Sequence, residues 1–464
     1  MKESVLTKKR WAMLPVIFAL AWPTMFEQLM QTAVQYIDTA MVGSLGTQAT
    51  AAVGSTATIS WLVGSSVSAL GIGFLSFISQ ACGAGDRERV RKLTAQSVLV
   101  MVVVGLFFTA LTFFLSPMVP MWMQVAEDIQ PLASRYFMIL YLPMLPRAAS
   151  IIFGTVLRSA GDTKTPMRVS LVVNLVNVVL NYLLIYPTRE LQLFSLRFTM
   201  PGAGWGVEGA AIASAIAFTV GGVMITAALW KHPLLSPKGG SLKPDVKILR
   251  PCLRVAFPNM LQRFATSLGY VAFAALINSL GEVSAAAHTI ANTVESAFYI
   301  PAFGMQTAAA TLAGNALGAN DRDKMREFAR MIIFIELVLM LVSGSLLFVF
   351  APDMAGIFSD SAEVILLCSA VLKMVAVSEP FYGVAIIIEG ILLGLGNTVL
   401  PFVLGVSGMW GIRIVGTYIC TKFLGQGLVA AWGCMIGHNM LLFAAYLVYY
   451  SSGRWNPLNR KKEN

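Results

Sequence analysis

Apolar residues occur along the chain in twelve long runs separated by short polar segments. Most runs exceed the roughly 20 residues that a helix needs to cross a bilayer, which predicts membrane helices that are tilted or kinked. We therefore expect an all-α integral membrane protein with twelve transmembrane helices. The runs cover approximately residues 13–43, 48–82, 90–122, 129–157, 164–187, 206–231, 247–278, 284–316, 325–351, 361–394, 398–421 and 427–450.

The residues that separate these runs recur in the second half of the chain at a fixed offset of 235 (256 minus 21). Ala21-Trp22-Pro23 corresponds to Ala256-Phe257-Pro258, and Gly161-Asp162-Thr163 corresponds to Gly396-Asn397-Thr398. The offset later falls to 221, since Gly206 corresponds to Gly427. The first half therefore carries 14 additional residues (235 minus 221) between about 187 and 205. Two equivalent halves in a very apolar chain are typical of secondary transporters.

The repeat predicts two pseudo-symmetric six-helix bundles, residues 1–231 and 247–464, joined by a linker at 232–246. The second bundle ends in a basic tail. Lysine and arginine gather before the first predicted helix, in alternate loops, in the linker and in the tail. The positive-inside rule then places both termini and the linker in the cytoplasm. Because six is an even number, the two bundles have the same orientation, which is a parallel repeat.

The composition excludes an ordinary soluble protein, since 57% of the residues are hydrophobic and only 12% are charged. The formal net charge of +10 follows from the topology and does not indicate nucleic acid. The first apolar run is too long for a cleavable signal peptide. Five cysteines without a ligand spacing such as Cys-x-x-Cys indicate neither a disulfide framework nor a metal site. We expect no cofactor and no structural metal.

Polar residues inside the predicted helices are the best guide to chemistry, because ionisable groups are costly in a membrane. In the first helix, spacings of three and four place Gln28, Gln31, Gln35 and Asp38 on one face, with Glu27 beside them. In the fifth helix the same spacing aligns Asn174, Asn177 and Asn181. The two faces can share a polar pocket, or the asparagines can bind helices together.

The second bundle carries a different set of polar residues. Glu295 and Tyr299 share a face of the eighth helix, and Glu379, Tyr382 and Glu389 lie on the tenth. These glutamates either form neutralising ion pairs with Arg263 and Arg413 or load and release protons. Pro301 and Pro380 are expected to interrupt the eighth and tenth helices. The candidates for a substrate cavity are Glu27, Gln31, Gln35, Asn174, Glu295, Tyr299, Glu379 and Glu389.

The motifs between and inside these helices resemble the MATE (multidrug and toxic compound extrusion) family along essentially the whole chain. The resemblance implies a V-shaped pair of bundles that exports cationic or amphipathic compounds in exchange for Na⁺ or H⁺. The motifs are Pro23-Thr24-Met25-Phe26-Glu27-Gln28, Asp38-Thr39-Ala40-Met41-Val42-Gly43-Ser44-Leu45-Gly46, Gly83-Ala84-Gly85-Asp86, Leu157-Arg158-Ser159-Ala160-Gly161-Asp162-Thr163-Lys164-Thr165-Pro166 and Gly206-Val207-Glu208-Gly209-Ala210-Ala211.

The same resemblance implies that Asp38, Asn177 and Asn181 form a cation-binding and coupling site. Some branches of the family have aspartate at the position of Asn181. The asparagine of this chain resembles the sodium-linked members, but it leaves the choice between Na⁺ and H⁺ open. Two acidic positions that some branches use in the second bundle fall on Thr266 and Tyr382. We therefore expect that Glu295, Glu379 or Glu389 replaces those acids.

The function expected from the sequence is an ion-coupled multidrug antiporter, a monomer in the bilayer of the bacterial cytoplasmic membrane. The alternative is a lipid-linked oligosaccharide flippase of the same superfamily, although such proteins often have 14 helices and a strongly cationic cavity. An integral membrane enzyme would need an Asp/His or Ser/His cluster, which three scattered histidines do not supply. A channel would need a selectivity-filter motif, and none occurs.

Overall fold

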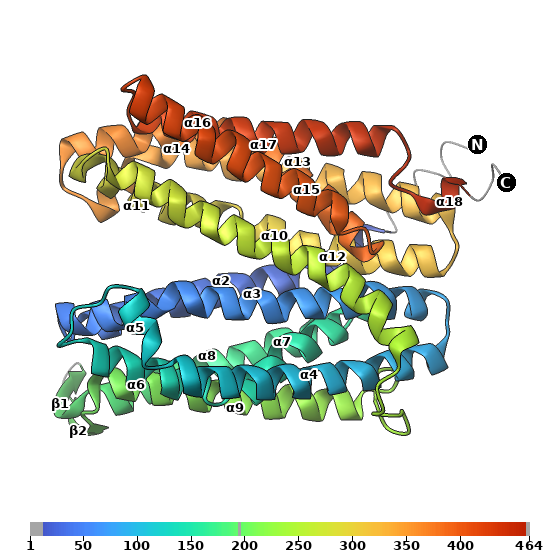
Figure 1. The fold of residues 1–464 in the computed structure, drawn as a ribbon, viewed down its shortest axis with the longest axis horizontal. Coiled ribbons are helices and arrows are strands. Elements are labelled where there is room, and N and C mark those ends of the chain that lie inside the picture. The colour runs from blue at the N-terminus through green and yellow to red at the C-terminus, as the bar shows by residue number, and fades with distance from the viewer. Residues whose placement is uncertain (1–12, 194–195, 461–464) are drawn as a thin grey trace. The chain divides into compact units, whose positions relative to one another are not determined.

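The computed structural model describes residues 13–193 and 196–460, and most of this part is helical (Figure 1). The chain divides into two compact units. Unit 1 contains the described parts of Met1–Met25, Leu75–Arg87 and Arg250–Asn464, and unit 2 contains Phe26–Phe74 and Glu88–Leu249. The basic clusters at residues 8–10 and 461–462, which we expect in the cytoplasm, lie outside the described residues.

The helices begin and end close to the polar segments that separate the apolar runs. In the first half they are α2 (Leu14–Gly43), α3 (Thr47–Gly83), α4 (Arg87–Leu115), α5 (Met118–Trp122), α6 (Gln130–Tyr141), α7 (Met144–Ser159), α8 (Lys164–Ile185) and α9 (Gly206–Lys231). In the second half they are α10 (Val246–Asn278), α11 (Glu282–Phe298), α12 (Ile300–Gly318), α13 (Arg322–Phe358), α14 (Ala362–Gly394), α15 (Val399–Ser407), the π-helix η1 (Gly408–Ile414), α16 (Val415–Tyr418), the π-helix η2 (Ile419–Phe423), α17 (Leu428–Ser451) and α18 (Pro457–Arg460).

The backbone repeats at the same offset as the sequence. A turn with positive φ ends the helix at corresponding places, namely Gly46 and Gly281 (φ +109° and +105°), Gly85 and Asn320 (+70° and +54°), and Gly161 and Gly396 (+88° and +79°). Glycine favours this left-handed conformation because it has no Cβ. The two halves therefore share these turns.

The broken helix is a different one in each half. α3 is continuous, whereas the corresponding residues of the second half form α11 and α12, which meet at Tyr299 beside Pro301. Conversely, α6 and α7 meet at a bend of 51°, while the corresponding α14 is continuous through Pro380. The prediction that Pro380 interrupts its helix is wrong, because a proline removes one backbone hydrogen bond and a helix can absorb that loss.

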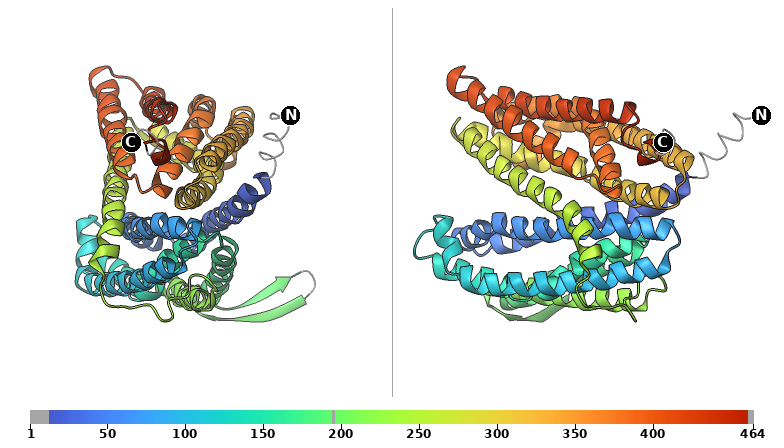
Figure 2. Two further views of the ribbon diagram at one scale, coloured as in Figure 1. Left: turned by 90° about the vertical axis from the view of Figure 1, so that its right-hand side faces the viewer. Right: turned by 45° about the vertical axis from the view of Figure 1, so that its right-hand side comes forward.

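The 14 additional residues of the first half form a β-hairpin between α8 and α9, which the sequence analysis did not predict. β1 (Pro187–Leu193) pairs antiparallel with β2 (Leu196–Ala203). The Arg189 guanidinium carbon lies 4.3 and 4.0 Å from the ring centroids of Tyr182 and Tyr186, which fastens the hairpin to the end of α8. Figure 2 shows the strands extending away from the helices.

The ends of α2 and α3 explain why the compact units differ from the two halves of the sequence. The hydroxyl of Thr24 on α2 donates to the carbonyl of Gly304 on α12 at 3.0 Å. The hydroxyl of Ser76 on α3 donates to the carbonyl of Gly394 on α14 at 3.1 Å. Small residues allow such close approach of helices in membrane proteins, so these two ends pack within unit 1.

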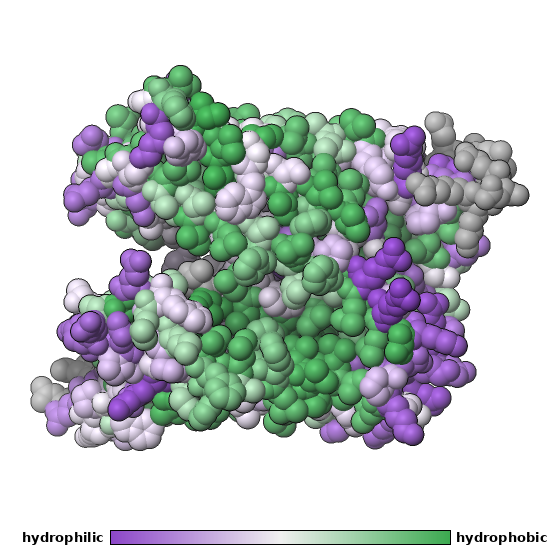
Figure 3. Space-filling model, viewed as in Figure 1, coloured by the Kyte–Doolittle hydropathy of each residue, from purple (hydrophilic) through white to green (hydrophobic). Residues whose placement is uncertain are grey.

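Nine helical segments in the described part of the chain are long and apolar enough to cross a membrane, and the bent pair α6–α7 adds a tenth. The 30-residue α2 and the pair α11–α12 take the two remaining places in the predicted series of twelve. Apolar residues cover the middle of the helices on the face in Figure 3, and hydrophilic residues gather at the helix ends. The chain is a multi-pass membrane protein.

Candidate functional site

The two polar faces predicted on the first and fifth helices meet inside unit 2. Nδ2 of Asn181 on α8 donates to Oδ1 of Asp38 on α2 at 2.6 Å. The amide of Asn177 satisfies its surroundings best with its nitrogen toward the same carboxylate, 2.9 and 3.1 Å from the two oxygens. Its oxygen then accepts from the hydroxyl of Ser214 on α9 at 3.0 Å. Two amides therefore hold the Asp38 carboxylate.

The side chains of this cluster have the chemistry of a cation-binding site. Asn177 and Asn181 are 6% and 1% exposed, and Asp38 is half-buried. Oδ1 of Asn181 is buried and has no hydrogen-bond partner among the described residues. Carboxylate and amide oxygens are the ligands that hard cations take, and a carboxylate can instead take up a proton. The residues present fit either Na⁺ or H⁺.

Three predicted cavity residues lie near this cluster but not in it. Gln31 and Gln35 on α2 are exposed. Asn174 on α8 is half-buried, and its Nδ2 is buried without a hydrogen-bond partner in the described part of the chain. Asn174 precedes Asn177 by one helical turn, so it lies next to the Asp38 cluster.

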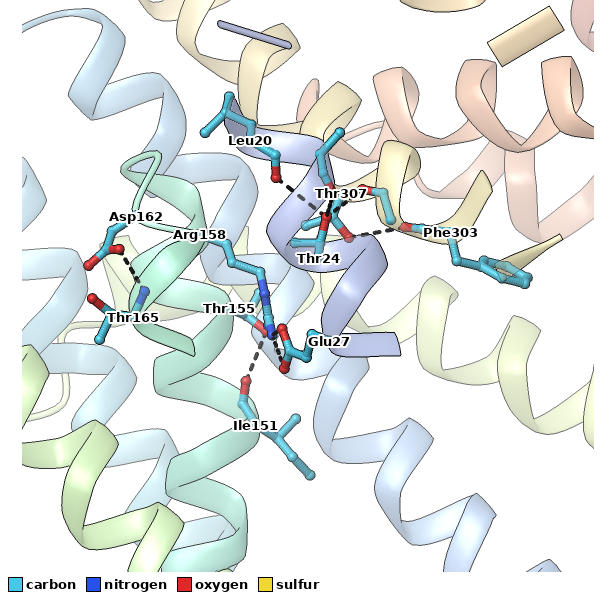
Figure 4. Close-up of polar contacts among 12 residues, drawn as sticks. Leu20, Thr24, Glu27, Ile151, Thr155, Arg158, Asp162, Thr165, Phe303 and Thr307 are labelled. Carbon is cyan, nitrogen blue, oxygen red and sulfur yellow. Dashed lines mark hydrogen bonds and ion pairs between the residues drawn. The ribbon is translucent and has the colours of Figure 1, made fainter. Parts of the chain in front are cut away.

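Glu27 forms a buried ion pair that the sequence analysis missed. Nη2 of Arg158 on α7 donates to both carboxylate oxygens of Glu27 at 2.7 and 2.6 Å (Figure 4). The Glu27 and Arg158 side chains are only 9% and 18% exposed. The pair joins α2 to α7. It explains the charge at position 27, and no bound ligand is needed to do so. Its basic partner, Arg158, belongs to the motif at residues 157–166, so the motif itself contains the signal for this pair.

A second group of acidic residues lies inside unit 1. Glu295 on α11 and Glu379 on α14 were both predicted, and Glu336 on α13 joins them, at 0% exposure. Glu379 interacts electrostatically with both of the other carboxyl groups. Neither oxygen of Glu336 or of Glu379 has a hydrogen-bond partner among the described residues. Glu336 was missed although a lone acid in an apolar helix is itself a functional signal.

Two arginines of unit 1 act on the predicted glutamates from a distance, Arg413 on Glu295 and Arg263 on Glu389. In the part of the chain that the structure describes, neither Arg263 nor Arg413 forms an ion pair. Arg263 donates instead to Oδ1 of Asn259 at 3.0 Å. The Arg413 guanidinium carbon, on η1, lies 5.3 Å from the ring centroids of both Tyr270 and Phe273. Of the two alternatives, neutralising ion pairs are not formed as direct contacts among the described residues, because the arginines are held by an amide and by aromatic rings.

The remaining predicted residues of unit 1 border the acidic group. Oε1 of Glu389 accepts from Nε2 of Gln262 at 3.0 Å. The rings of Tyr299 and Tyr382 meet edge to face, with centroids 6.2 Å apart. Tyr299 also marks the break between α11 and α12. Residues from α10, α11, α13 and α14 thus form a polar interior in an otherwise apolar unit.

Comparison with known proteins identifies the family. The model of the MatE family matches residues 23–183 and 258–419, and its two matches begin 235 residues apart (258 minus 23). The chain is 28% identical over 439 residues to "Probable multidrug resistance protein NorM" of Thermotoga maritima, covering 95% of this chain and 92% of that protein. It is 25% identical over 446 residues to "Probable multidrug resistance protein YoeA" of Bacillus subtilis, with coverages of 95% and 93%.

Solved structures share the fold. The crystal structure of MATE in complex with MaL6 has a TM-score of 0.87 at 21% identity and covers 96% of this chain and 97% of that one. The match to the family model spans over two thirds of the chain and repeats at the internal offset. The chain belongs to the MatE family, a family of secondary transporters.

Proposed function

We propose that this transporter is a cation-coupled antiporter that exports cationic or amphipathic drugs and other toxic compounds in exchange for Na⁺ or H⁺. The observation that carries the proposal is the Asp38 carboxylate held by Asn177 and Asn181 among apolar helices. An ionisable side chain in such a place is found where ions or substrates pass. The relatives named as probable multidrug resistance proteins support drugs as the substrates.

Coupling requires that the cation and the drug favour different conformations of the transporter. A ligand shifts a conformational equilibrium only by its difference in affinity for the two states, and a nearly complete shift takes about 5.5 kcal/mol. Both amide nitrogens now face the Asp38 carboxylate. An arriving Na⁺ would attract the amide oxygens instead, and an arriving proton would remove the negative charge. Either change loosens the contact between α2 and α8, so α2 is the helix that we propose moves.

The proposal also covers location and assembly. The transporter lies in the bacterial cytoplasmic membrane as a monomer, with both termini and the linker at 232–246 in the cytoplasm. Drugs enter from the cytoplasm or from the inner leaflet. The candidate cavity residues are Gln31, Gln35, Asn174, Glu295, Tyr299, Glu379 and Glu389.

Efflux from proteoliposomes tests the proposal, with Na⁺ and pH gradients imposed separately. The wild-type protein should move a cationic drug against its concentration gradient in response to one of the two. Asp38→Asn keeps the size of the side chain and removes the charge, so it should still bind the drug and lose gradient-driven efflux. Asp128→Asn, at an exposed carboxylate of the same unit, is the matched control. Efflux by Asp38→Asn at the wild-type rate would place the coupling site elsewhere.

A further inference from the structure

Two cysteines of unit 1 meet across a pair of neighbouring helices. Cys420 lies on η2 and Cys434 on α17, and their Sγ atoms are 3.8 Å apart. Both are free thiols, and both are half-buried. A short loop at 424–427 separates the two helices, so α17 returns along the helix that precedes it (Figure 1). The two sulfurs are therefore in contact although the residues are 14 positions apart (434 minus 420).

Glycines bring α17 close to the facing helix at this level. A Cβ on Gly416 would lie 3.1 Å from Sγ and 3.5 Å from Cβ of Cys434. Small residues at such positions let two membrane helices approach closely. Gly416 precedes Cys420 by one turn, so the two residues share a face of their helix. Further along the same contact, Gly408 lies against the His438 ring, so the close packing continues beyond the two sulfurs.

The backbone around Cys420 can adjust to a bond between the sulfurs. Cys420 lies in a π-helical turn, and its carbonyl accepts from the amide of Gln426 at 2.9 Å, close to the helix end. Helix ends open more easily than helix centres, and π-helical turns often occur at functional positions. A disulfide bond is about 2.05 Å long, so the sulfurs need to approach by less than about 2 Å. Rotation of the side chains and a small shift of the helix end supply this movement.

Thiols in contact can exchange with the disulfide of an oxidant. The thiolate of one cysteine attacks the oxidant's disulfide, so that a mixed disulfide forms and one thiol leaves. The thiolate of the other cysteine then attacks the mixed disulfide and releases the oxidant's second thiol. The pair loses two electrons and two protons, and the oxidant gains them. We propose that Cys420 and Cys434 are the site of a reversible disulfide that joins η2 to α17.

The oxidant that we infer is a protein disulfide outside the cytoplasm. The proposed topology places the loop at 424–427 on the outer side of the membrane, and disulfides form and persist in such oxidising compartments. This location rests on the proposed function, whereas the bond itself depends on neither the coupling ion nor the drug. The bond would restrict the unfolded chain, which stabilises the folded protein.

Reaction of the purified full-length protein with dithiodipyridine, a small apolar disulfide, tests the inference. An isolated cysteine releases one thiopyridone and keeps one pyridine adduct, whereas a contacting pair releases two thiopyridones and keeps none. Peptide mapping by mass spectrometry, after remaining thiols are blocked with N-ethylmaleimide, should find Cys420 joined to Cys434 without an adduct on either. Thermal unfolding of the oxidised protein should occur at a higher temperature than that of the reduced protein. Dithiothreitol should reverse both changes.

Cys434→Ser separates the pair, so Cys420 should keep one pyridine adduct and oxidation should no longer raise the unfolding temperature. Cys368→Ser, on α14, is the matched control outside the pair and should form the bond as the wild-type protein does. Adducts retained on both cysteines would overturn the inference, as would no reaction of either thiol or a bond to a third cysteine or a second molecule. Formation of the bond in a protein whose loop at 424–427 proves to be cytoplasmic would contradict only the proposed topology.

Discussion

The amide nitrogen of Asn181 lies 2.6 Å from a carboxylate oxygen of Asp38, a residue 143 positions earlier in the chain. Asn181 is 1% exposed, so the donor side of this hydrogen bond is shielded from water. Asn181 on α8 therefore fixes the orientation of the Asp38 carboxylate on α2, and a substitution of either residue affects the contact between the two helices.

We expect Asn181→Ala to raise the cation concentration that gives half-maximal efflux about tenfold. The substitution removes a hydrogen bond to a charged group, which contributes about 1.5 kcal/mol, together with a free amide oxygen. Efflux measured against a series of Na⁺ concentrations and pH values checks this. Gln48→Ala is the control, because that amide donates to Asp128 at 3.3 Å on the exposed part of the unit. An unchanged half-maximal concentration would remove Asn181 from the proposed ion site.

Breaking the pair between Glu27 and Arg158 should destabilise the protein. Glu27→Gln removes one charge of a pair whose side chains are 9% and 18% exposed, and breaking such a pair costs about 3–5 kcal/mol. Replacing both residues by methionine should restore most of the loss, because no charge then remains buried. The thermal unfolding temperatures of the wild-type protein, the single variant and the double variant, measured in detergent, test both expectations. The exposed pair of Arg135 and Glu208 provides the comparison, with an expected effect of about 1 kcal/mol or less.

The buried glutamates of unit 1 should differ in their effect on cationic drugs. Both oxygens of Glu379 lack partners among the described residues, whereas Glu389 is bound by Gln262. We expect Glu379→Gln to lower resistance to cationic drugs about tenfold, the equivalent of about 1.4 kcal/mol, and to spare neutral ones. Glu389→Gln should have a smaller effect. Full resistance to every cationic drug in the Glu295, Glu336 and Glu379 variants would show that these residues are structural.

The topology can be tested at Ser241, which is exposed and lies in the linker predicted to be cytoplasmic. In a variant without the five native cysteines, Ser241→Cys should react with a membrane-impermeant thiol reagent only in inverted vesicles. Gln426→Cys, in the loop between η2 and α17, should react only from outside intact cells. Labelling of position 241 from outside would contradict the parallel repeat.

Much of the fold could be predicted from the sequence because the turns repeat. Glycine at 46 and 281, and at 161 and 396, adopts the same left-handed conformation in both halves, so aligned residues gave aligned helix ends. Spacings of three and four aligned the polar residues on each helix, and the resemblance to the MATE family implied that Asp38 and Asn181 belong to one site.

Pairings across the bundle could not be predicted in this way. Periodicity tells which residues share a face and not which face lies opposite, so the contact of Glu27 with Arg158, 131 positions away, was missed. The hairpin was missed for another reason. Leucine alternates with polar residues at 191 and 193, a period that indicates a strand, but the comparison of the two halves identifies the segment only as an insertion.

Each half contains one break between two helices, which we call its joint. The joint lies between α6 and α7 in the first half and between α11 and α12 in the second, and a charged residue lies beside each. In the first half the joint between α6 and α7 is followed directly by Arg147. In the second half the joint at Tyr299 follows Glu295 by one turn. Two shorter helices can turn independently where one long helix cannot, so a rotation of α11 would carry Glu295 away from Glu379 without displacing α12. Because the first half is broken between α6 and α7 instead, the corresponding rotation in that half would move a different pair of helices.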